Sequence, residues 1–349
     1  MVSHSLADLA KVLGGALEGP GDVTVEAVGD PAASAVGEII VWREETPVPA
    51  DASASAVVAR HGVDCGGRPV IRVESPRLAL ALLLAVLHPE PQPEPGIHET
   101  AVIDPEADIA PDVHVGAHAT IGRARIGAGT VVGPGCFVDD GVSVGAGCRL
   151  FPRVMLIEGT RLGDRVRIHA GSVLGADGFG YEPQPTGLTK VPQRGGVEIG
   201  DDVEIGALTA IDRSTLPGSF TRVGAGTKID NLVQIAHNVQ VGRCCFICAC
   251  CGIAGSTTVG DGAVLGGQVG VRDHVTIGAG AQLAGASAVY GNVPEGATYG
   301  GWPARPHRQF LYIEASLRRV PNLLKTVKEL EKRVAELEAD AQARGTPDA

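Results

Sequence analysis

The chain has 349 residues, enough for two or three domains with cores of their own. Aromatic residues make up only 3% of it, whereas glycine occurs 49 times, a composition that is poor for an ordinary globular core and typical of a solenoid. The net charge of −11 comes without a basic stripe or stacking aromatics, and it argues against nucleic acid as a partner.

Residues 1–95 are predicted to form a small N-terminal α/β domain. A helical pattern covers Ser5–Leu17, and Val23–Val28 and Ala56–Ala59 have the composition of strands. The most apolar run, Leu78–Leu87, spans about ten residues, which is too short to cross a bilayer. We therefore expect a buried helix there and no transmembrane segment.

A Pro-rich linker, His88–Pro95, leads into a region from 96 to 294 in which an apolar residue recurs at every sixth position. This grid runs from Ile97 to Ile121, from Ile126 to Leu174, from Ile199 to Ile211 and from Val223 to Val289. A period of six fits neither an α-helix nor a hairpin, but it fits a short strand followed by a tight turn. Three such units close one triangular coil, so the region predicts about ten stacked coils.

Hexapeptide repeats of this kind resemble the left-handed parallel β-helix of the hexapeptide acyltransferases, an exception to the usual right-handed crossovers. The expected fold is therefore mainly β. The grid has one large interruption, from Gly175 to about Val197, and a smaller one after Ile211.

Residues 295–349 are predicted to form a C-terminal helical tail, with Pro321 breaking the helix just before it. Apolar residues there alternate steps of four and three, a heptad seam of nearly three heptads. The seam consists of Leu323, Val327, Leu330, Val334, Leu337 and Ala341. Two interpretations remain open: an amphipathic helix that folds back on its own subunit, and a helix bundle between subunits.

Met1–Leu13 lacks the basic start and long apolar stretch of a secretory signal, so we expect a cytoplasmic protein with reduced cysteines. Five of the eight cysteines cluster at Cys244, Cys245, Cys248, Cys250 and Cys251. A metal site is conceivable, but successive units of the coil would point these thiols in different directions. We expect them to serve as small apolar side chains, and we expect neither a metal nor a cofactor.

Three residues share one side of the predicted solenoid. His237 and Gly255 are 18 residues apart, which places them at the same corner of neighbouring coils, and His274 lies 37 residues after His237 on the same side. A neutral imidazole can take the proton of an attacking amine, and a glycine amide can donate to the oxyanion of a tetrahedral intermediate. Asp230 and Asn231 fall on the preceding face, where they could orient His237 or the substrate.

Seven segments together resemble one family, the UDP-3-O-(3-hydroxyacyl)glucosamine N-acyltransferases of lipid A synthesis. These segments are Gly175–Tyr181, Lys190–Gln193, Ile199–Gly206, Thr209–Arg213, Ile229–Asn231, Gln234–Val239 and Ala254–Ser256. The resemblance extends over nearly the whole chain. It implies a homotrimer with a site between neighbouring subunits, a thioester of acyl carrier protein as acyl donor and a UDP-linked acylated glucosamine as acceptor.

Carried over by position, the resemblance implies that His237 is the catalytic base, Gly255 the oxyanion donor and His274 the second active-site histidine. The substrate-binding residues that it implies are Asp177, Phe179, Tyr181, Lys190, Gln193, Asp230, Asn231, Gln234 and Asn238. The tail would help to dock the acidic carrier protein. Its candidate cations are Arg305, Arg308, Arg318, Arg319 and Lys325.

The segment Ile40–Pro47 departs from the family, which has an aromatic, an Asn and a Tyr there that grip uracil. This chain offers only Trp42, which could stack on the base. Acylation of a different nucleotide sugar is therefore an open alternative. A metal-dependent hydratase would need three converging histidines, and a non-catalytic scaffold would leave the loop Asp177–Tyr181 without a purpose.

Overall fold

The computed structural model describes residues 3–301 and 306–344. The chain divides into two compact units, Met1–Pro93 and Glu94–Ala349, each described here by itself. In the described ranges, every helix is too short or too polar to cross a membrane.

The N-terminal unit is a five-stranded sheet with two helices packed on one face. In chain order its elements are β1 (His4–Ser5), α1 (Leu6–Leu13), β2 (Ala16–Glu18), β3 (Thr24–Val25), β4 (Ala27–Gly29), β5 (Glu38–Val41), β6 (Ala56–Ala59), β7 (Val70–Arg72) and α2 (Pro76–Leu87). The sheet has the order β2-β7-β6-β5-β4, and all pairs except β2–β7 are parallel. Because side chains alternate along a strand, Ile39 faces the helices while Ile40 faces a second cluster under the loops.

Two helices of this unit differ from their predictions. Helix α1 begins after Ser5, whose side chain caps it, and ends at Leu13, four residues before the expected end at Leu17. Gly14, in the left-handed conformation (φ +59°), caps its C-terminus. Helix α2 is buried on one face only, since Leu78 and Leu84 are 60% and 43% exposed. The prediction of a buried helix over Leu78–Leu87 is therefore only half correct.

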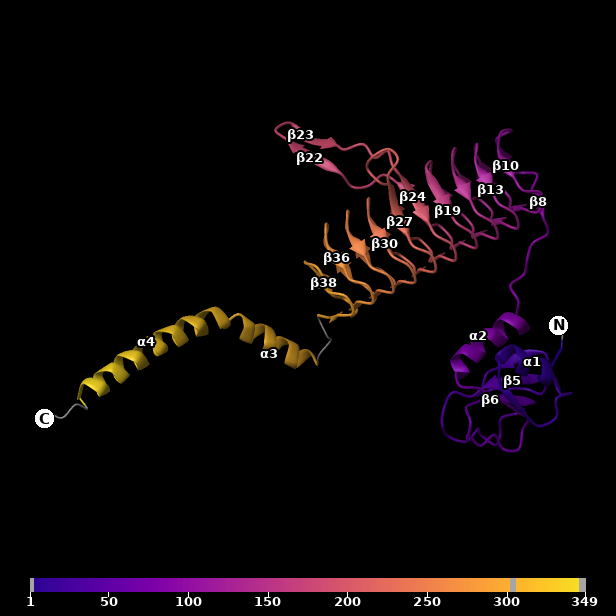
Figure 1. Cartoon of the computed structure of the whole chain (residues 1–349), viewed down its shortest axis with the longest axis horizontal. Helices are drawn as coiled ribbons and strands as arrows, with labels where there is room; N and C mark the ends of the chain where they lie inside the picture. The colour runs from indigo at the N-terminus through magenta and orange to yellow at the C-terminus, as the bar shows by residue number, and fades with distance from the viewer. Residues whose placement is uncertain (1–2, 302–305, 345–349) are drawn as a thin grey trace. The chain divides into compact units, whose positions relative to one another are not determined.

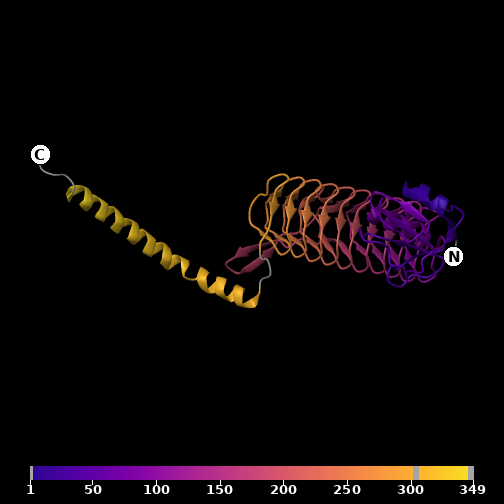
Figure 2. The same cartoon turned by 90° about the horizontal axis from the view of Figure 1, so that it is seen from below.

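The second unit is built on a left-handed parallel β-helix, as predicted, whose coils follow one another regularly (Figures 1 and 2). Each coil contributes one short strand to each of three parallel sheets, which we call faces 1, 2 and 3 in chain order.

Face 1 contains β8 (Gly96–Ile97), β11 (His114–Val115), β14 (Val131–Val132), β17 (Arg149–Leu150), β20 (Arg167–Ile168), β25 (Glu204–Ile205), β28 (Lys228–Ile229), β31 (Phe246–Ile247), β34 (Val264–Leu265), β37 (Gln282–Leu283) and β39 (Thr298–Tyr299). Face 2 contains β9 (Val102–Ile103), β12 (Thr120–Ile121), β15 (Phe137–Val138), β18 (Met155–Leu156), β21 (Val173–Ala176), β26 (Ala210–Asp212), β29 (Gln234–Ile235), β32 (Gly252–Ile253), β35 (Gly270–Val271) and β38 (Ala288–Val289). Face 3 contains β10 (Asp108–Ile109), β13 (Arg125–Ile126), β16 (Ser143–Val144), β19 (Thr160–Leu162), β24 (Gly196–Ile199), β27 (Phe220–Val223), β30 (Gln240–Val241), β33 (Thr258–Val259) and β36 (Thr276–Ile277). The first, second and third corners follow faces 1, 2 and 3.

The residues of the six-residue grid form the core of the prism. Ile235, Ile253 and Val115 are at most 1% exposed, whereas Ile97, in the first coil, is 53% exposed because no coil covers it. The last strand of face 1 ends at Tyr299, so the coil continues beyond residue 294.

Two excursions leave the coil next to the second corner. The larger one carries an exposed hairpin of β22 (Tyr181–Gln184) and β23 (Gly187–Lys190), which projects from the solenoid in Figure 1. The smaller one follows β26 and returns at β27. Backbone bonds from Arg194 to Thr215 and from Gly195 to Ser214 join the two excursions.

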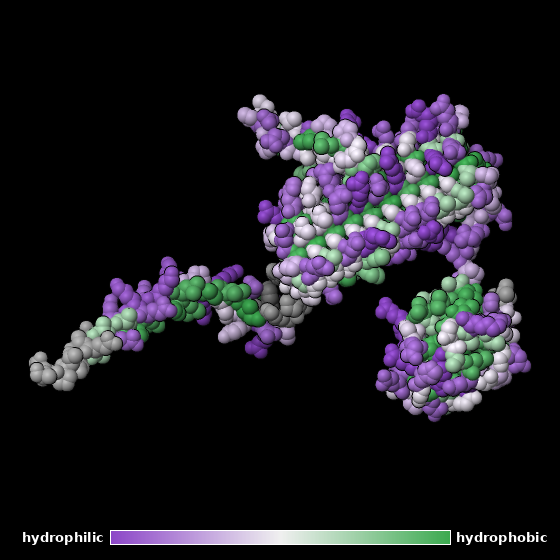
Figure 3. Space-filling view, viewed as in Figure 1, coloured by the Kyte–Doolittle hydropathy of each residue, from purple (hydrophilic) through white to green (hydrophobic). Residues whose placement is uncertain are grey.

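The described part of the tail consists of two helices, α3 (His307–Leu317) and α4 (Val320–Arg344). Pro321 lies in the first turn of α4, so the helix breaks just before it, as predicted. The seam residues from Leu323 to Leu337 are 47–60% exposed, and apolar side chains gather on the visible side of both helices (Figure 3).

Candidate active site

His237 lies at the second corner, two residues after the end of β29, and its ring rests on Gly255 of the next coil. The strand register Gln234↔Gly252 places His237 and Gly255 one above the other in neighbouring coils, as their spacing of 18 residues predicts. A Cβ added to Gly255 would lie 2.6 Å from Cε1 and 2.8 Å from Nε2 of His237. A Cβ on Gly178, in the larger excursion, would lie 2.6 Å from the Cβ of His237. Glycine on both sides therefore leaves room for the imidazole.

Asn238 holds the ring of His237. Its Nδ2 lies 3.0 Å from Nδ1 of the imidazole, while its Oδ1 accepts bonds from the Thr215 N–H (3.0 Å) and the Ser214 hydroxyl. The Thr215 hydroxyl in turn donates to Oε1 of Gln193, a side chain that is only 2% exposed. The smaller excursion and the base of the larger one thus jointly fix the orientation of His237.

The N–H of Gly255 has no hydrogen-bond partner among the described residues. Equivalent corner amides are often capped by the next coil: Asp164 accepts from Ala146 at 2.8 Å, and Asp261 accepts from Arg243 at 2.7 Å. The residue above Gly255 is Asp273, whose carboxylate instead accepts from the Arg272 guanidinium. Gly255 therefore presents a free donor beside His237.

His274 lies one coil beyond Gly255 at the same corner. Its N–H donates to the Gly255 carbonyl at 3.2 Å, and its backbone is left-handed (φ +54°). Asn238 and Ser256, at the equivalent positions of the two preceding coils, are also left-handed. The two predicted histidines therefore share one edge of the prism, with Gly255 between them.

The predicted residues of the larger excursion fall into three groups. Lys190 forms an ion pair with Asp177 across the base of the hairpin, and this carboxylate raises the pKa of the Lys190 ammonium group. The rings of Phe179 and Tyr181 pack edge to face with centroids 5.1 Å apart, and Phe179 is 85% exposed. Gln193 is buried under the excursion and bonds to Thr215.

Asp230 and Asn231 do not contact His237 within one chain. They lie at the first corner, at the opposite edge of face 2, where Asn231 accepts the N–H of Ala207 at 2.7 Å. Both line a separate cavity of about 480 Å³ that also includes Phe246. The expectation that they could orient His237 is not met within one subunit, because Asn238 already occupies that position.

Trp42 belongs to the N-terminal unit. Its indole N–H donates to the Thr46 carbonyl at 2.8 Å, and the ring packs, half-buried, against the cluster that contains Ile40. Stacking of Trp42 on a base therefore stays a prediction.

Asp212 is a residue at this corner that the sequence reasoning missed. It lies at the end of β26, one coil below His237, and it is only 7% exposed. Gln234 donates to its Oδ2 at 2.9 Å. The pKa of the Asp212 carboxyl is raised above its ordinary value, chiefly by burial. The hydrogen bond from Gln234 and the nearby His237 act in the opposite direction and lower it. A signal was present, since an acidic residue directly follows the grid residue Ile211.

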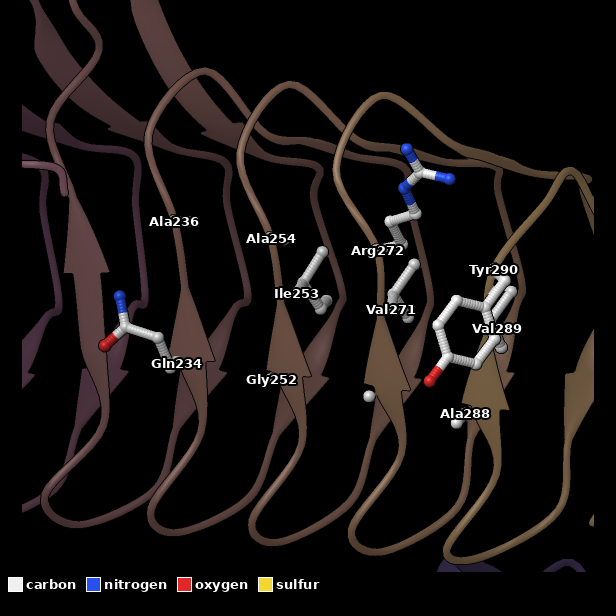
Figure 4. Close-up of a pocket in the computed structure, with 11 residues that line it drawn as sticks. Gln234, Ala236, Gly252, Ile253, Ala254, Val271, Arg272, Ala288, Val289 and Tyr290 are labelled. Carbon is white, nitrogen blue, oxygen red and sulfur yellow. The ribbon is translucent and has the colours of Figure 1, made fainter. Parts of the chain in front are cut away.

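A groove of about 440 Å³ runs along face 2 from the coil of His237 toward the end of the solenoid. Its outward-facing positions in four successive coils are Gln234, Gly252, Gly270 and Ala288. Gln234 and Tyr290 stand at its two ends in Figure 4, with Gly252 between them. A Cβ on Gly252 or Gly270 would meet no atom within 4 Å, so this chain's own packing does not require either glycine.

The cysteine cluster only partly matches its prediction. Cys245 and Cys251 are buried in the core as small apolar side chains, whereas Cys244 and Cys250 are exposed at corners. In the ranges 3–301 and 306–344, no three side chains of His, Cys, Asp or Glu converge into a metal site.

Comparisons with known proteins identify relatives of this chain. The family model for bacterial transferase hexapeptide (six repeats) matches residues 220–255, which include His237 and Gly255. A UDP-3-O-acylglucosamine N-acyltransferase of Anaeromyxobacter dehalogenans is 41% identical and covers 98% of this chain and 99% of its own. The chain belongs to the UDP-3-O-acylglucosamine N-acyltransferase family. A member from Syntrophotalea carbinolica is 39% identical over 96% of this chain and 98% of its own.

Family membership confirms the resemblance found in the sequence. Among solved structures, the UDP-N-acetylglucosamine acyltransferase of Francisella novicida covers 59% of this chain and 67% of its own, at 25% identity and a TM-score of 0.49.

Proposed function

We propose that this protein transfers a 3-hydroxyacyl chain from an acyl carrier protein thioester to the 2-amine of UDP-3-O-(3-hydroxyacyl)glucosamine, in lipid A synthesis. The observation that supports it best is the stacking of His237 on Gly255, whose N–H is free. The relatives named UDP-3-O-acylglucosamine N-acyltransferase are similar to this chain over nearly their full lengths.

In the proposed mechanism the amine nitrogen attacks the thioester carbonyl carbon while His237 takes one of its protons. The Gly255 N–H donates to the oxyanion of the tetrahedral intermediate. The intermediate then collapses, the C–S bond breaks, and the imidazolium returns its proton to the thiolate. The products are the amide and the free thiol of the carrier protein. In this proposal His274, the second histidine, contacts the substrate.

Proton transfer through Nε2 requires the ring tautomer that has its hydrogen on Nδ1. In the described arrangement the Nδ2 of Asn238 faces Nδ1, which suits the opposite tautomer. The mechanism therefore needs a turn of the Asn238 amide that lets Oδ1 accept from Nδ1. Oδ1 then gives up the bonds that it accepts from the Thr215 N–H and the Ser214 hydroxyl.

The groove on face 2 suits the acyl chain, because its floor is lined by glycine and alanine and it begins beside His237. Around the approach to the corner, the exposed side chains that would contact the sugar and its acyl group are Asp177, Phe179, Tyr181 and Lys190. The buried Gln193 would support them through its bond to Thr215. We assign nucleotide binding to the N-terminal domain, residues 1–95, with Trp42 as the stacking residue.

A homotrimer belongs to the proposal, because Asp230 and Asn231 can reach a reaction centre only if it is formed with a neighbouring subunit. Two leucines in left-handed conformations, Leu208 and Leu232, are 62% and 55% exposed on the first corner, where a neighbour could cover them. The exposed seam of α4 supports a helix bundle between subunits.

The carrier protein would dock on the tail, where Arg308, Arg318, Arg319 and Lys325 are exposed, and Arg305 lies outside the described residues. We also propose a cytoplasmic location for the protein.

The test is mass spectrometry of the product formed from UDP-3-O-acylglucosamine and a panel of 3-hydroxyacyl carrier proteins. The proposal predicts an N-acylated product with a preferred chain length. Acylation only of another nucleotide sugar would favour the alternative acceptor, and no acyl transfer with any pair would refute the proposal.

A further inference from the structure

Asp212 occupies a position from which its charge can act on His237. The strand pairing of β26 with β29 places Asp212 beside Ala236, the residue before His237, in the neighbouring coil. Coils in such a stack are about 4.8 Å apart. The carboxylate is nine-tenths buried, so its field is screened by little water.

The hydrogen bonding of this carboxylate does not neutralise its charge. Its one hydrogen bond among the described residues comes from the neutral amide of Gln234. No ion pair of Asp212 exists within those residues, and Arg213 points its guanidinium at the Glu158 carbonyl. A buried carboxylate without a cation is unfavourable unless a positive charge comes close.

The proposed reaction forms such a charge, because His237 becomes an imidazolium when it takes the proton of the amine. We propose that Asp212 is a positioning residue whose carboxylate stabilises the imidazolium of His237 and so sets the lower pH limit of the reaction. This inference rests on the proposed function, although the coupling between Asp212 and His237 can be measured without substrate.

Other charges near Asp212 act on it less directly. Asp177 lies on the same side and raises the pKa of Asp212, but Lys190 is paired with Asp177 and offsets its charge. Burial also raises this pKa, while His237 lowers it, as expected if the carboxylate and the imidazolium favour each other.

The experiment uses the full-length protein with Asp212→Asn. Carbethoxylation of His237 by diethylpyrocarbonate requires a neutral ring, so its rate against pH, followed by peptide mass spectrometry, reports the pKa of His237. Loss of the carboxylate disfavours the imidazolium, so the midpoint should fall by about half a unit to one unit. The acid limb of kcat/KM should move to lower pH by the same amount.

Asp164→Asn is the matched control, because it removes a carboxylate from a different corner and keeps an oxygen for the Ala146 N–H. It should leave both midpoints unchanged, and Asp212→Ser should reproduce the shift if Asp212→Asn folds poorly. A midpoint for His237 in folded Asp212→Asn that equals the wild-type midpoint would overturn the inference. If the wild type forms no N-acylated product, the proposed function fails, whereas the carbethoxylation arm still decides the coupling.

Discussion

At the scale of single residues, the chemistry depends on the absence of side chains around one imidazole. Gly178 and Gly255 enclose His237, and a methyl group on either would overlap it. The ring is then held from one side by Asn238. The site is therefore specified as much by its two glycines as by its histidine.

Gly255→Ala should lower kcat/KM by about 10²- to 10³-fold, because the added Cβ displaces the ring and blocks the approach of the thioester to the free N–H. Gly291→Ala is the matched control. It changes the equivalent corner position two coils later, where a Cβ would meet nothing within 4 Å, and it should retain activity. Steady-state assays compare the two, and equal rates would contradict the role given to Gly255.

The sequence predicts which residues share this corner, because the six-residue period converts spacing directly into position. It does not predict the partner of His237, which was expected at Asp230 or Asn231 and proves to be Asn238. That contact depends on the smaller excursion, where Ser214 and Thr215 fix the amide, and excursions have no period from which to read their path.

At the scale of the elements, glycines at a corner and on a face of the prism have very different space around them. At the third corner a Cβ on Gly224 would lie 2.6 Å from the carbonyl carbon and oxygen of Gly242 in the next coil. On face 2, by contrast, Gly252 has open space around it. The same residue type is thus required for packing at one position and available for ligand at the other.

Gly224→Ala should reduce the free energy of unfolding by about 1–3 kcal/mol, because coils would have to separate to admit the methyl group. Gly252→Ala, the same change on face 2, should stay within about 0.5 kcal/mol of the wild type. Chemical denaturation followed by circular dichroism measures both. A loss in Gly224→Ala no larger than that in Gly252→Ala would contradict the difference in packing between the two positions.

At the scale of the whole molecule, a single chain leaves several apolar surfaces exposed. Leu208 and Leu232 are exposed in left-handed conformations, which cost about 1–2 kcal/mol each for residues with a Cβ, and the seam of α4 is exposed as well. The period of the repeats predicts the prism, and the heptads predict the helix. Neither pattern says which surface meets a neighbour, because that contact lies outside one chain.

Leu208→Asp combined with Leu232→Asp should weaken the proposed homotrimer, because it would bury two carboxylates at the contact. Light scattering after size-exclusion chromatography should give about three times 35.7 kDa for the wild type and a smaller mass for the variant. An unchanged assembly in the variant would place the subunit contact elsewhere.

The role of His237 is tested most directly by the rate of amide formation in His237→Ala, with a 3-hydroxyacyl carrier protein and UDP-3-O-acylglucosamine. We predict that kcat falls by about 10²- to 10⁴-fold while the assembly and the thermal unfolding midpoint are retained. Turnover at the wild-type rate by the folded variant would contradict the account.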